Sequence, residues 1–145
     1  MRIFGAHTSR PASEHQAEIR KTDIAVSKMI REQAGPCMTC GEEHEVYDCG
    51  HFRRRELMTT RFHPWNLGKQ GRKENRFEGG RMFEYGLAID KKYGTGTALF
   101  LKKLSETIEP WSITELQQLR SAARMGDRAF TQFYKEIRPH HFPTS

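Results

Sequence analysis

The chain has 145 residues, of which 36% are hydrophobic and 29% are charged. This length suits one domain with a modest core, and large apolar residues occur along the whole chain, which excludes wholesale disorder. No apolar run approaches the roughly 20 residues that cross a bilayer, and the N-terminus lacks the apolar stretch of a secretory signal. We therefore expect a cytoplasmic protein with no membrane association. Three cysteines, an odd number, argue against a disulfide framework.

The net charge of +6 is concentrated in one window of the chain. Between Arg53 and Arg81 there are nine Lys and Arg residues against three Glu, whereas the charges outside this window balance at 15 each. A local cationic excess suits a polyanion such as nucleic acid, because it pairs with phosphates and releases counterions. A solvated surface without a binding role is the alternative reading of the same window.

The first half of the chain predicts a helical segment followed by a hairpin. Ser13 to Gln16 has the form of a capping box, and apolar residues at helical spacing follow until about residue 33. Residues 45–52 alternate as a strand does, with Gly50 offering a bulge. Residues 59–66 predict an extended return segment, since Pro64 disfavours helix before it. A short helix is expected next, ended by Gly79 and Gly80.

The second half predicts helices. One should end at Gly94, a second covers residues 97–104, and a third begins at a capping box from Ser112 to Glu115. Leu116 and Leu119 should lie on one face of this third helix, as core or as a partner surface. A last helix is expected over residues 127–137, followed by a frayed tail. His44, His63, His140 and His141 have no partner that the sequence identifies with certainty, and the default reading treats them as ordinary residues.

One Cys-x-x-Cys pair, Cys37 and Cys40, has the spacing of half a zinc site. Tetrahedral zinc needs four ligands, and the chain has no second pair of this kind. His44 and Cys49 are nearby residues that could complete an improvised site. A structural zinc ion is therefore an open expectation at this stage.

His51, Asn66 and Asn75 follow one another in an order that suits phosphodiester hydrolysis. Histidine has the side-chain pKa nearest neutrality and can deprotonate water. A divalent cation must neutralise charge on the scissile phosphate, and an oxygen ligand such as the Asn75 amide can hold it. Asn66 could fix the connecting loop through its amide. The adjacent run of Arg53, Arg54 and Arg55 could clamp phosphates.

The stretches "GPCMTCG", "YDCGHFRRR", "TTRFHPWN" and "KQGRKENRFEGG" resemble the NinG/Rap family of lambdoid phage recombination endonucleases, a branch of the HNH, or ββα-metal, nucleases. The resemblance covers about residues 23–94. It implies an α+β fold with an N-terminal helical segment at 1–35, a small ββα-metal core at 36–94 and a helical C-terminal region at 95–145 packed on the same domain.

The family pattern also implies an activity and a role for each matching residue. His51 would be the general base, Asn66 the structural middle residue, Asp48 a supporting residue and Asn75 the ligand of a catalytic Mg²⁺ or Mn²⁺ ion. The substrate would be branched DNA, such as a Holliday junction or a D-loop, in the host cytoplasm. The residues expected to bind DNA are Arg53, Arg54, Arg55, Arg61, Lys69, Arg72, Lys73 and Arg76.

The chain departs from the family pattern at the second cysteine pair, where it has Gly71 and Glu74. The zinc knuckle is therefore expected to be half lost, with ordinary packing holding the hairpin on its helix. The aromatic residues expected to supply that packing are Phe52, Phe62, Trp65, Phe77 and Phe83.

Three functions fit the sequence. The first is the metal-dependent endonuclease, and the second is a nuclease-derived accessory protein that binds DNA without cleaving it. The third is a protein-interaction module that works through its helical half. Cleavage of two strands would require two active sites, so a homodimer is also expected.

Overall fold

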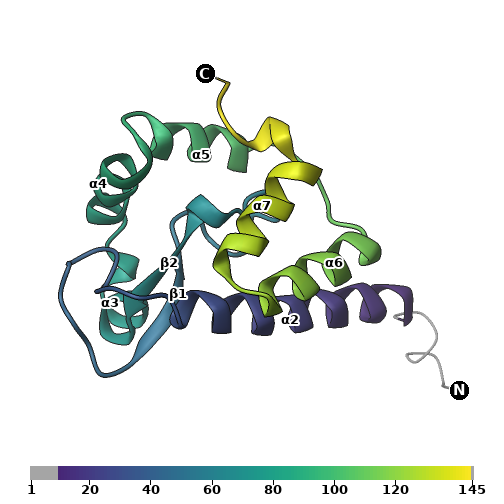
Figure 1. The fold of residues 1–145 in the computed structure, drawn as a ribbon, viewed down its shortest axis with the longest axis horizontal. Coiled ribbons are helices and arrows are strands. Elements are labelled where there is room, and N and C mark those ends of the chain that lie inside the picture. Colours follow the sequence, from purple (N-terminus) through teal and green to yellow (C-terminus); the bar gives the residue numbers. More distant parts are fainter. Residues whose placement is uncertain (1–9, 145) are drawn as a thin grey trace, which may run out of the picture.

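The computed structural model describes residues 10–144, and Figure 1 shows helices arranged around one short hairpin. Its helices and strands, in chain order, are α2 (Arg10–Arg31), β1 (Tyr47–His51), the 3-10 turn η1 (Pro64–Asn66), β2 (Leu67–Gly71), α3 (Arg72–Phe77), the 3-10 turn η2 (Gly79–Arg81), α4 (Met82–Tyr93), α5 (Thr97–Ser105), α6 (Ile113–Arg124), α7 (Asp127–Ile137) and the 3-10 turn η3 (Pro139–His141). None of the helices in this described range is long and apolar enough to cross a membrane.

The two strands form an antiparallel pair, and helix α3 follows the second strand directly. Tyr47 pairs with Gly71 at one end and His51 pairs with Leu67 at the other. The mixed α+β class predicted from the sequence is confirmed. The extended return segment predicted at 59–66 was wrong, because these residues form turns and η1, and the second strand begins only at Leu67. Pro64 starts η1, where its fixed φ and missing N–H are tolerated.

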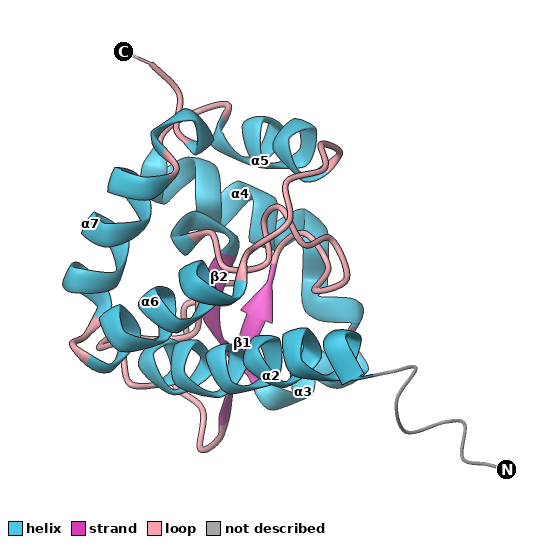
Figure 2. Cartoon of the chain, turned by 90° about the vertical axis from the view of Figure 1, so that its right-hand side faces the viewer, coloured by secondary structure: helices cyan, strands magenta, loops and turns pink. Residues whose placement is uncertain are grey.

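The main core joins the N-terminal helix to the C-terminal helices. Helix α6 lies along α2, and α7 packs on α6, as Figure 1 shows. Buried Val26 and Ile30 from α2 meet Leu116 and Leu119 from α6, with Trp111 in the same cluster. The face predicted for Leu116 and Leu119 is thus core rather than a partner surface. Figure 2 shows the hairpin in the middle of the molecule, surrounded by helices.

A second, smaller core lies between α4 and α5. Tyr85, Ile89 and Leu101 are fully buried there, and Phe52 and Trp65 pack against them. The hydroxyl group of Tyr85 donates a hydrogen bond of 2.9 Å to the backbone oxygen of Gly50. This bond ties the α4–α5 unit to strand β1 beside His51.

The aromatic packing expected between hairpin and helix is only partly present. Phe62 is buried in the main core, while Phe52 and Trp65 are half-buried in the second. Phe77 and Phe83, however, are exposed over 81% and 76% of their surface, so that expectation was wrong for these two residues. Helix α3 is only six residues long, and its apolar terminal residue extends beyond the small sheet into solvent.

The ends of the helices test the capping predictions. Ser112 and Glu115 form the predicted capping box at the start of α6. Ser13, in contrast, lies inside α2, which already includes Arg10, so the predicted start there was wrong. The expectation of a frayed tail was also wrong, because residues 139–141 form η3 and His141 is fully buried.

His63 holds part of this tail in place through a hydrogen bond to His141. Its buried ring donates from Nε2 to the backbone oxygen of His141 at 2.7 Å, and its Nδ1 accepts from the Trp65 backbone N–H at 3.1 Å. This pairing requires the neutral ring. Burial accordingly lowers the pKa of His63 from 6.5 to about 3, a shift that the hydrogen bond to His141 only partly opposes.

Acid should therefore destabilise the protein before its carboxylates titrate. Below pH 6.5 His63 is protonated in the unfolded chain but stays neutral in the folded chain. The free energy of unfolding therefore falls as pH falls. Between pH 7 and pH 5 we expect a loss of about 2 kcal/mol from this residue. Urea unfolding at both pH values measures it, and His63→Gln should show a smaller loss than the wild type. An equal loss in both proteins would assign the pH dependence to other groups.

Candidate functional site

A cleft of about 500 Å³ opens where the hairpin, helix α3 and turn η2 meet. The residues that line it are Cys49, His51, Phe52, Arg53, Arg54, Arg55, Asn75, Gly79, Gly80 and Met82. Two residues singled out from the sequence, His51 and Asn75, thus face one space from different elements. Helix α3 starts directly after β2 and contacts both strands of the hairpin, which brings Asn75 to the cleft that His51 lines.

His51 is the last residue of β1 and is neutral at pH 7. Burial lowers its pKa from 6.5 to about 4, and the positive charges of Arg61 and Arg55 lower it further. The charge of Asp23 and a hydrogen bond to the Arg61 backbone oppose that shift. An imidazole that is neutral and lines a cleft can accept a proton from a molecule bound there.

Asp48 fixes the orientation of Asn75. Its Oδ2 accepts a hydrogen bond of 3.1 Å from Nδ2 of Asn75 and one of 2.9 Å from Nε of Arg76, while Oδ1 accepts from Nε of Arg72 at 3.0 Å. Burial alone would raise the pKa of Asp48, but these donors outweigh it and lower that pKa. Within residues 13–144 the amide oxygen of Asn75 makes no hydrogen bond, so it remains available as a ligand atom for a cation in the cleft.

Asn66 holds the loop between the strands closed. Its buried amide accepts from the Arg53 backbone N–H at 2.7 Å and donates to the backbone oxygens of Arg53 and Thr60, each at 3.1 Å. The backbone oxygen of Asn66 also accepts from Phe52 N–H at 2.9 Å. These bonds fix the segment that follows His51. The Arg53 side chain itself donates to Ser105 Oγ at 3.0 Å, which draws it toward α5.

The basic residues near the cleft differ in how far they are available. Arg54, Arg55 and Lys73 are exposed, and the first two line the cleft. Arg72 and Arg76 are half-exposed and paired with the Asp48 carboxylate. An incoming phosphate could therefore pair with Arg54 and Arg55 without breaking an existing ion pair.

Arg61 and Lys69 are instead engaged within the fold. Arg61 makes a two-pronged ion pair with Asp23 on α2, and its side chain is only 12% exposed. Lys69 donates to the backbone oxygen of Gln33 at 2.9 Å and lies over the Tyr47 ring at 4.3 Å. Both cations hold α2 and the hairpin in place, which makes them poor candidates for contacts with DNA.

A second group of ligand-type side chains lies beside the hairpin, close to α3. Cys37, Cys40, His44 and Glu74 each offer one donor atom, and all four donor atoms lie within 4.8 Å of one another. His44 Nε2 is 3.2 Å from Cys40 Sγ and 3.3 Å from Glu74 Oε2. Two thiols, an imidazole and a buried carboxylate make up a donor set that could hold a metal ion.

The surroundings of these four residues also fit a bound cation. Burial and a hydrogen bond to Glu74 raise the pKa of the Cys40 thiol to about 12, so a cation bound here would have to displace its proton. The backbone N–H of Gly71 points at Cys37 Sγ at 3.4 Å. Such N–H donors to sulfur are the outer-shell contacts that orient metal-binding cysteines.

The second cysteine pair is absent, as the sequence indicates, but the structure places two other ligand-type side chains beside Cys37 and Cys40. At Gly71, where the family pattern has a cysteine, an added Cβ would lie 2.8 Å from the His44 ring. The His44 ring therefore lies where a side chain at position 71 would be, and Glu74 is the ligand-type residue three positions further along. The sequence pattern named His44 as a possible ligand but missed Glu74. Cys49 lies in the cleft instead and does not belong to the group.

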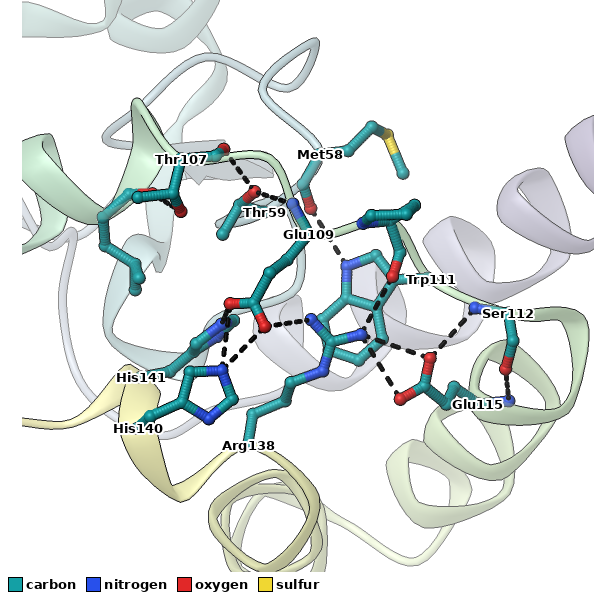
Figure 3. A network of polar contacts seen from close by, with 12 residues as sticks. Met58, Thr59, Thr107, Glu109, Trp111, Ser112, Glu115, Arg138, His140 and His141 are labelled. Atoms are coloured by element: carbon teal, nitrogen blue, oxygen red, sulfur yellow. Dashed lines mark hydrogen bonds and ion pairs between the residues drawn. The ribbon is translucent and has the colours of Figure 1, made fainter.

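A third cluster, Glu109 with His140 and His141, also gathers ligand-type atoms, and Figure 3 shows it. Nε2 of His141 lies 2.6 Å from Glu109 Oε1, and Nε2 of His140 lies 2.7 Å from Oε2. Nη1 of the buried Arg138 also approaches Glu109 at 3.4 Å, and Tyr134 contacts the other nitrogen of His141. A permanent cation already faces this carboxylate, so the cluster works as an internal tie for the C-terminal tail.

These features define the chain as a basic α+β protein. It has a cluster of side chains that could bind a metal ion and, close by, a cleft lined by a histidine and an asparagine. Residues 8–132 match the family described as Bacteriophage Lambda NinG protein, and the chain belongs to that NinG family. No curated protein and no solved structure matches the chain.

Proposed function

We propose that the chain is a divalent-metal-dependent DNA endonuclease of the HNH type that acts on branched recombination intermediates, such as Holliday junctions or D-loops. One observation carries the proposal. The β1–β2 hairpin and α3 follow one another in the ββα order, and they bring His51 and Asn75 to one cleft with Arg54 and Arg55 on its wall. Membership of a phage protein family supports the link to recombination.

In this mechanism His51 is the general base. Its neutral ring takes a proton from the attacking water, and the charge that it gains is offset by the phosphate bound in front of it. An anion beside an imidazole favours the protonated form, so substrate binding raises the pKa of His51 toward the working pH. Arg54 and Arg55 hold phosphates on the wall of the cleft and position the scissile bond.

Asn75 would hold the catalytic metal ion through its amide oxygen. The hydrogen bond from its Nδ2 to Asp48 keeps that oxygen turned away from the carboxylate. Bound Mg²⁺ or Mn²⁺ supplies charge neutralisation at the scissile phosphate and the leaving oxygen. Asp48 acts as a positioning residue because its own oxygens are occupied by Arg72, Arg76 and Asn75.

We assign the cluster of Cys37, Cys40, His44 and Glu74 to a structural zinc ion. Zinc accepts thiolate, imidazole and carboxylate ligands together, whereas Mg²⁺ prefers oxygen ligands alone. The four side chains would supply as many ligands as a closed structural zinc site needs. The two metal ions would thus have separate duties, one in folding and one in cleavage.

A cleavage assay with matched substrates tests the proposed function. Four-way-junction, D-loop and plain duplex DNA of equal length are incubated with protein loaded with one equivalent of zinc. Parallel reactions contain Mg²⁺, Mn²⁺ or no added divalent ion, because a chelator would also remove structural zinc. We expect cleavage only with Mg²⁺ or Mn²⁺ and faster cleavage of the branched DNA. Binding without cleavage in every metal would overturn the endonuclease and support an accessory DNA-binding protein.

A further inference from the structure

Two exposed phenylalanines lie on either side of the turn that forms one wall of the cleft. Phe77 ends α3 and Phe83 lies in the first turn of α4, and they are exposed over 81% and 76% of their surface. Between them, Gly79 and Gly80 line the cleft. Single exposed apolar residues are common, but here two exposed aromatic residues precede and follow, along the chain, the glycines that line a basic cleft, and together they offer a binding surface.

The turn between these two phenylalanines has a fixed backbone. Gly79 and Gly80 have φ values of 63° and 75°, and Arg81 has a φ of 50°, which non-glycine residues seldom adopt. The Gln70 side chain, buried in β2, donates to the backbone oxygen of Gly80 at 2.8 Å. The chain therefore bends sharply between the two phenylalanines, and their backbone positions are set before any ligand binds.

The charges around the rings favour a polyanionic ligand over an apolar protein surface. Lys73 lies one helical turn before Phe77 and is exposed, and Arg76 is the residue next to Phe77. Glu78 and Glu84, the nearby acidic residues, both approach Arg81, at 3.8 and 3.6 Å. A docking helix would have to desolvate the exposed Lys73, whereas the phosphates of a DNA strand would pair with it.

We infer that Phe77 and Phe83 stack on DNA bases whose faces are not covered by a neighbouring base. This inference rests on the proposed function and deepens it, because it names the part of the substrate that is recognised. Bases within a duplex are covered by their neighbours, whereas bases at a branch point or in a single strand expose their faces. Stacking on an aromatic ring tolerates every base. The two rings would thus give preference for branched DNA without sequence preference.

Binding, measured apart from cleavage, tests this inference. Fluorescence anisotropy is recorded for zinc-loaded protein without added Mg²⁺, using four-way-junction, single-stranded and duplex DNA. Phe77→Ala and Phe83→Ala should each weaken binding to the junction and the single strand about 5- to 50-fold and leave duplex binding nearly unchanged. Phe77→Trp should bind the junction and the single strand about as tightly as the wild type, because an indole ring also stacks on bases.

Ile108→Ala is the matched control. Ile108 is 92% exposed but lies in the connection between α5 and α6, far along the chain from the glycines of the cleft. Its replacement should leave every affinity unchanged. A 2-aminopurine base placed at the branch point provides a second readout, since stacking on a ring alters its fluorescence, and Phe77→Ala should abolish that change.

The outcomes separate this inference from the proposed function. If the wild type binds no DNA even at low salt, the proposed function and the inference fail together. If the wild type cleaves junctions but both alanine variants bind them as tightly as the wild type, the inference fails and the endonuclease stands. If the variants lose self-association in sedimentation while each copy binds the junction unchanged, the rings form an interface between two copies, which also overturns base stacking.

Discussion

His51→Ala should lower the single-turnover rate of DNA cleavage by about 10²- to 10⁴-fold, the usual contribution of a positioned general base. Binding of the junction should be retained, because in the proposed mechanism Arg54 and Arg55, which line the cleft, would hold the phosphates rather than the imidazole. The fold should also survive, since His51 ends its strand beside an open cleft and is only half-buried. Rapid-quench cleavage and anisotropy, measured on the same protein, separate the two effects.

His140→Ala is the matched control for this substitution. His140 is exposed, lies far along the chain in the C-terminal tail and contacts Glu109, which retains His141 and Arg138 as partners. Its loss should leave the cleavage rate unchanged. Added imidazole should partly rescue His51→Ala, because the cleft of about 500 Å³ admits a free base. A His51→Ala protein that cleaves like the wild type would remove His51 from the mechanism.

The pH dependence of cleavage should follow the protonation of His51. Only the neutral ring can accept a proton, so the rate falls as pH falls through the pKa of His51. In the free protein burial sets that pKa at about 4, which places the acid limb of kcat/KM well below the usual histidine value of 6.5. The limb of kcat reports the complex with DNA, where the bound phosphate should move it to higher pH.

Local signals in the sequence were sufficient for the elements that carry the candidate site. Alternation predicted the strand that ends at His51, and paired glycines predicted the end of α3. The capping box at Ser112 marked the start of α6 because a serine and a glutamate three residues apart satisfy each other's backbone groups. These features depend on neighbours within one or two turns, which a single sequence displays.

Contacts between distant parts of the chain could not be predicted in the same way. His63 and His141 are 78 residues apart, and only the folded chain brings the ring of one to the backbone of the other. Glu74 was equally hidden, since a glutamate in a basic helix reads as a surface residue until Cys37 and His44 are placed against it. Such ligands carry no spacing signal of their own, and the crowding of Gly71 against His44 is the clue that only coordinates provide.

The two candidate metal sites are joined through helix α3. Glu74 and Asn75 are consecutive residues, so one side chain reaches the cysteines while the next lines the cleft. A helix of six residues has little stability of its own, because the cost of starting it is spread over few hydrogen bonds. An ion held by Glu74 would fix α3 and would therefore determine where the amide of Asn75 lies. Zinc loading should thus affect cleavage as well as stability.

Removing one ligand tests this coupling. Glu74→Ala should abolish stoichiometric zinc binding and lower the melting temperature by about 10 °C, because a loss of several kcal/mol in a chain of this size shifts Tm by that amount. Cys49→Ser should retain both properties, since Cys49 lies outside the ligand group. Zinc is counted by its release to a colorimetric chelator, and replacement with Co²⁺ should give the intense visible absorption of a tetrahedral thiolate site.

Glu74→Cys provides the decisive comparison, because it returns a thiolate to a position where the family pattern has one. It should bind zinc at least as tightly as the wild type and strengthen the thiolate bands of the cobalt form. Cleavage should follow zinc occupancy. It should fall in Glu74→Ala, where α3 loses its link to the ion, and persist in Glu74→Cys, where the new thiolate again fixes α3 and Asn75. A wild type that holds no zinc, with a melting temperature indifferent to chelators, would show that hydrogen bonds alone maintain the knuckle. In that case the wild type and Glu74→Ala should both lack the cobalt bands, and the hydrogen bond to Asp48 would set the position of Asn75.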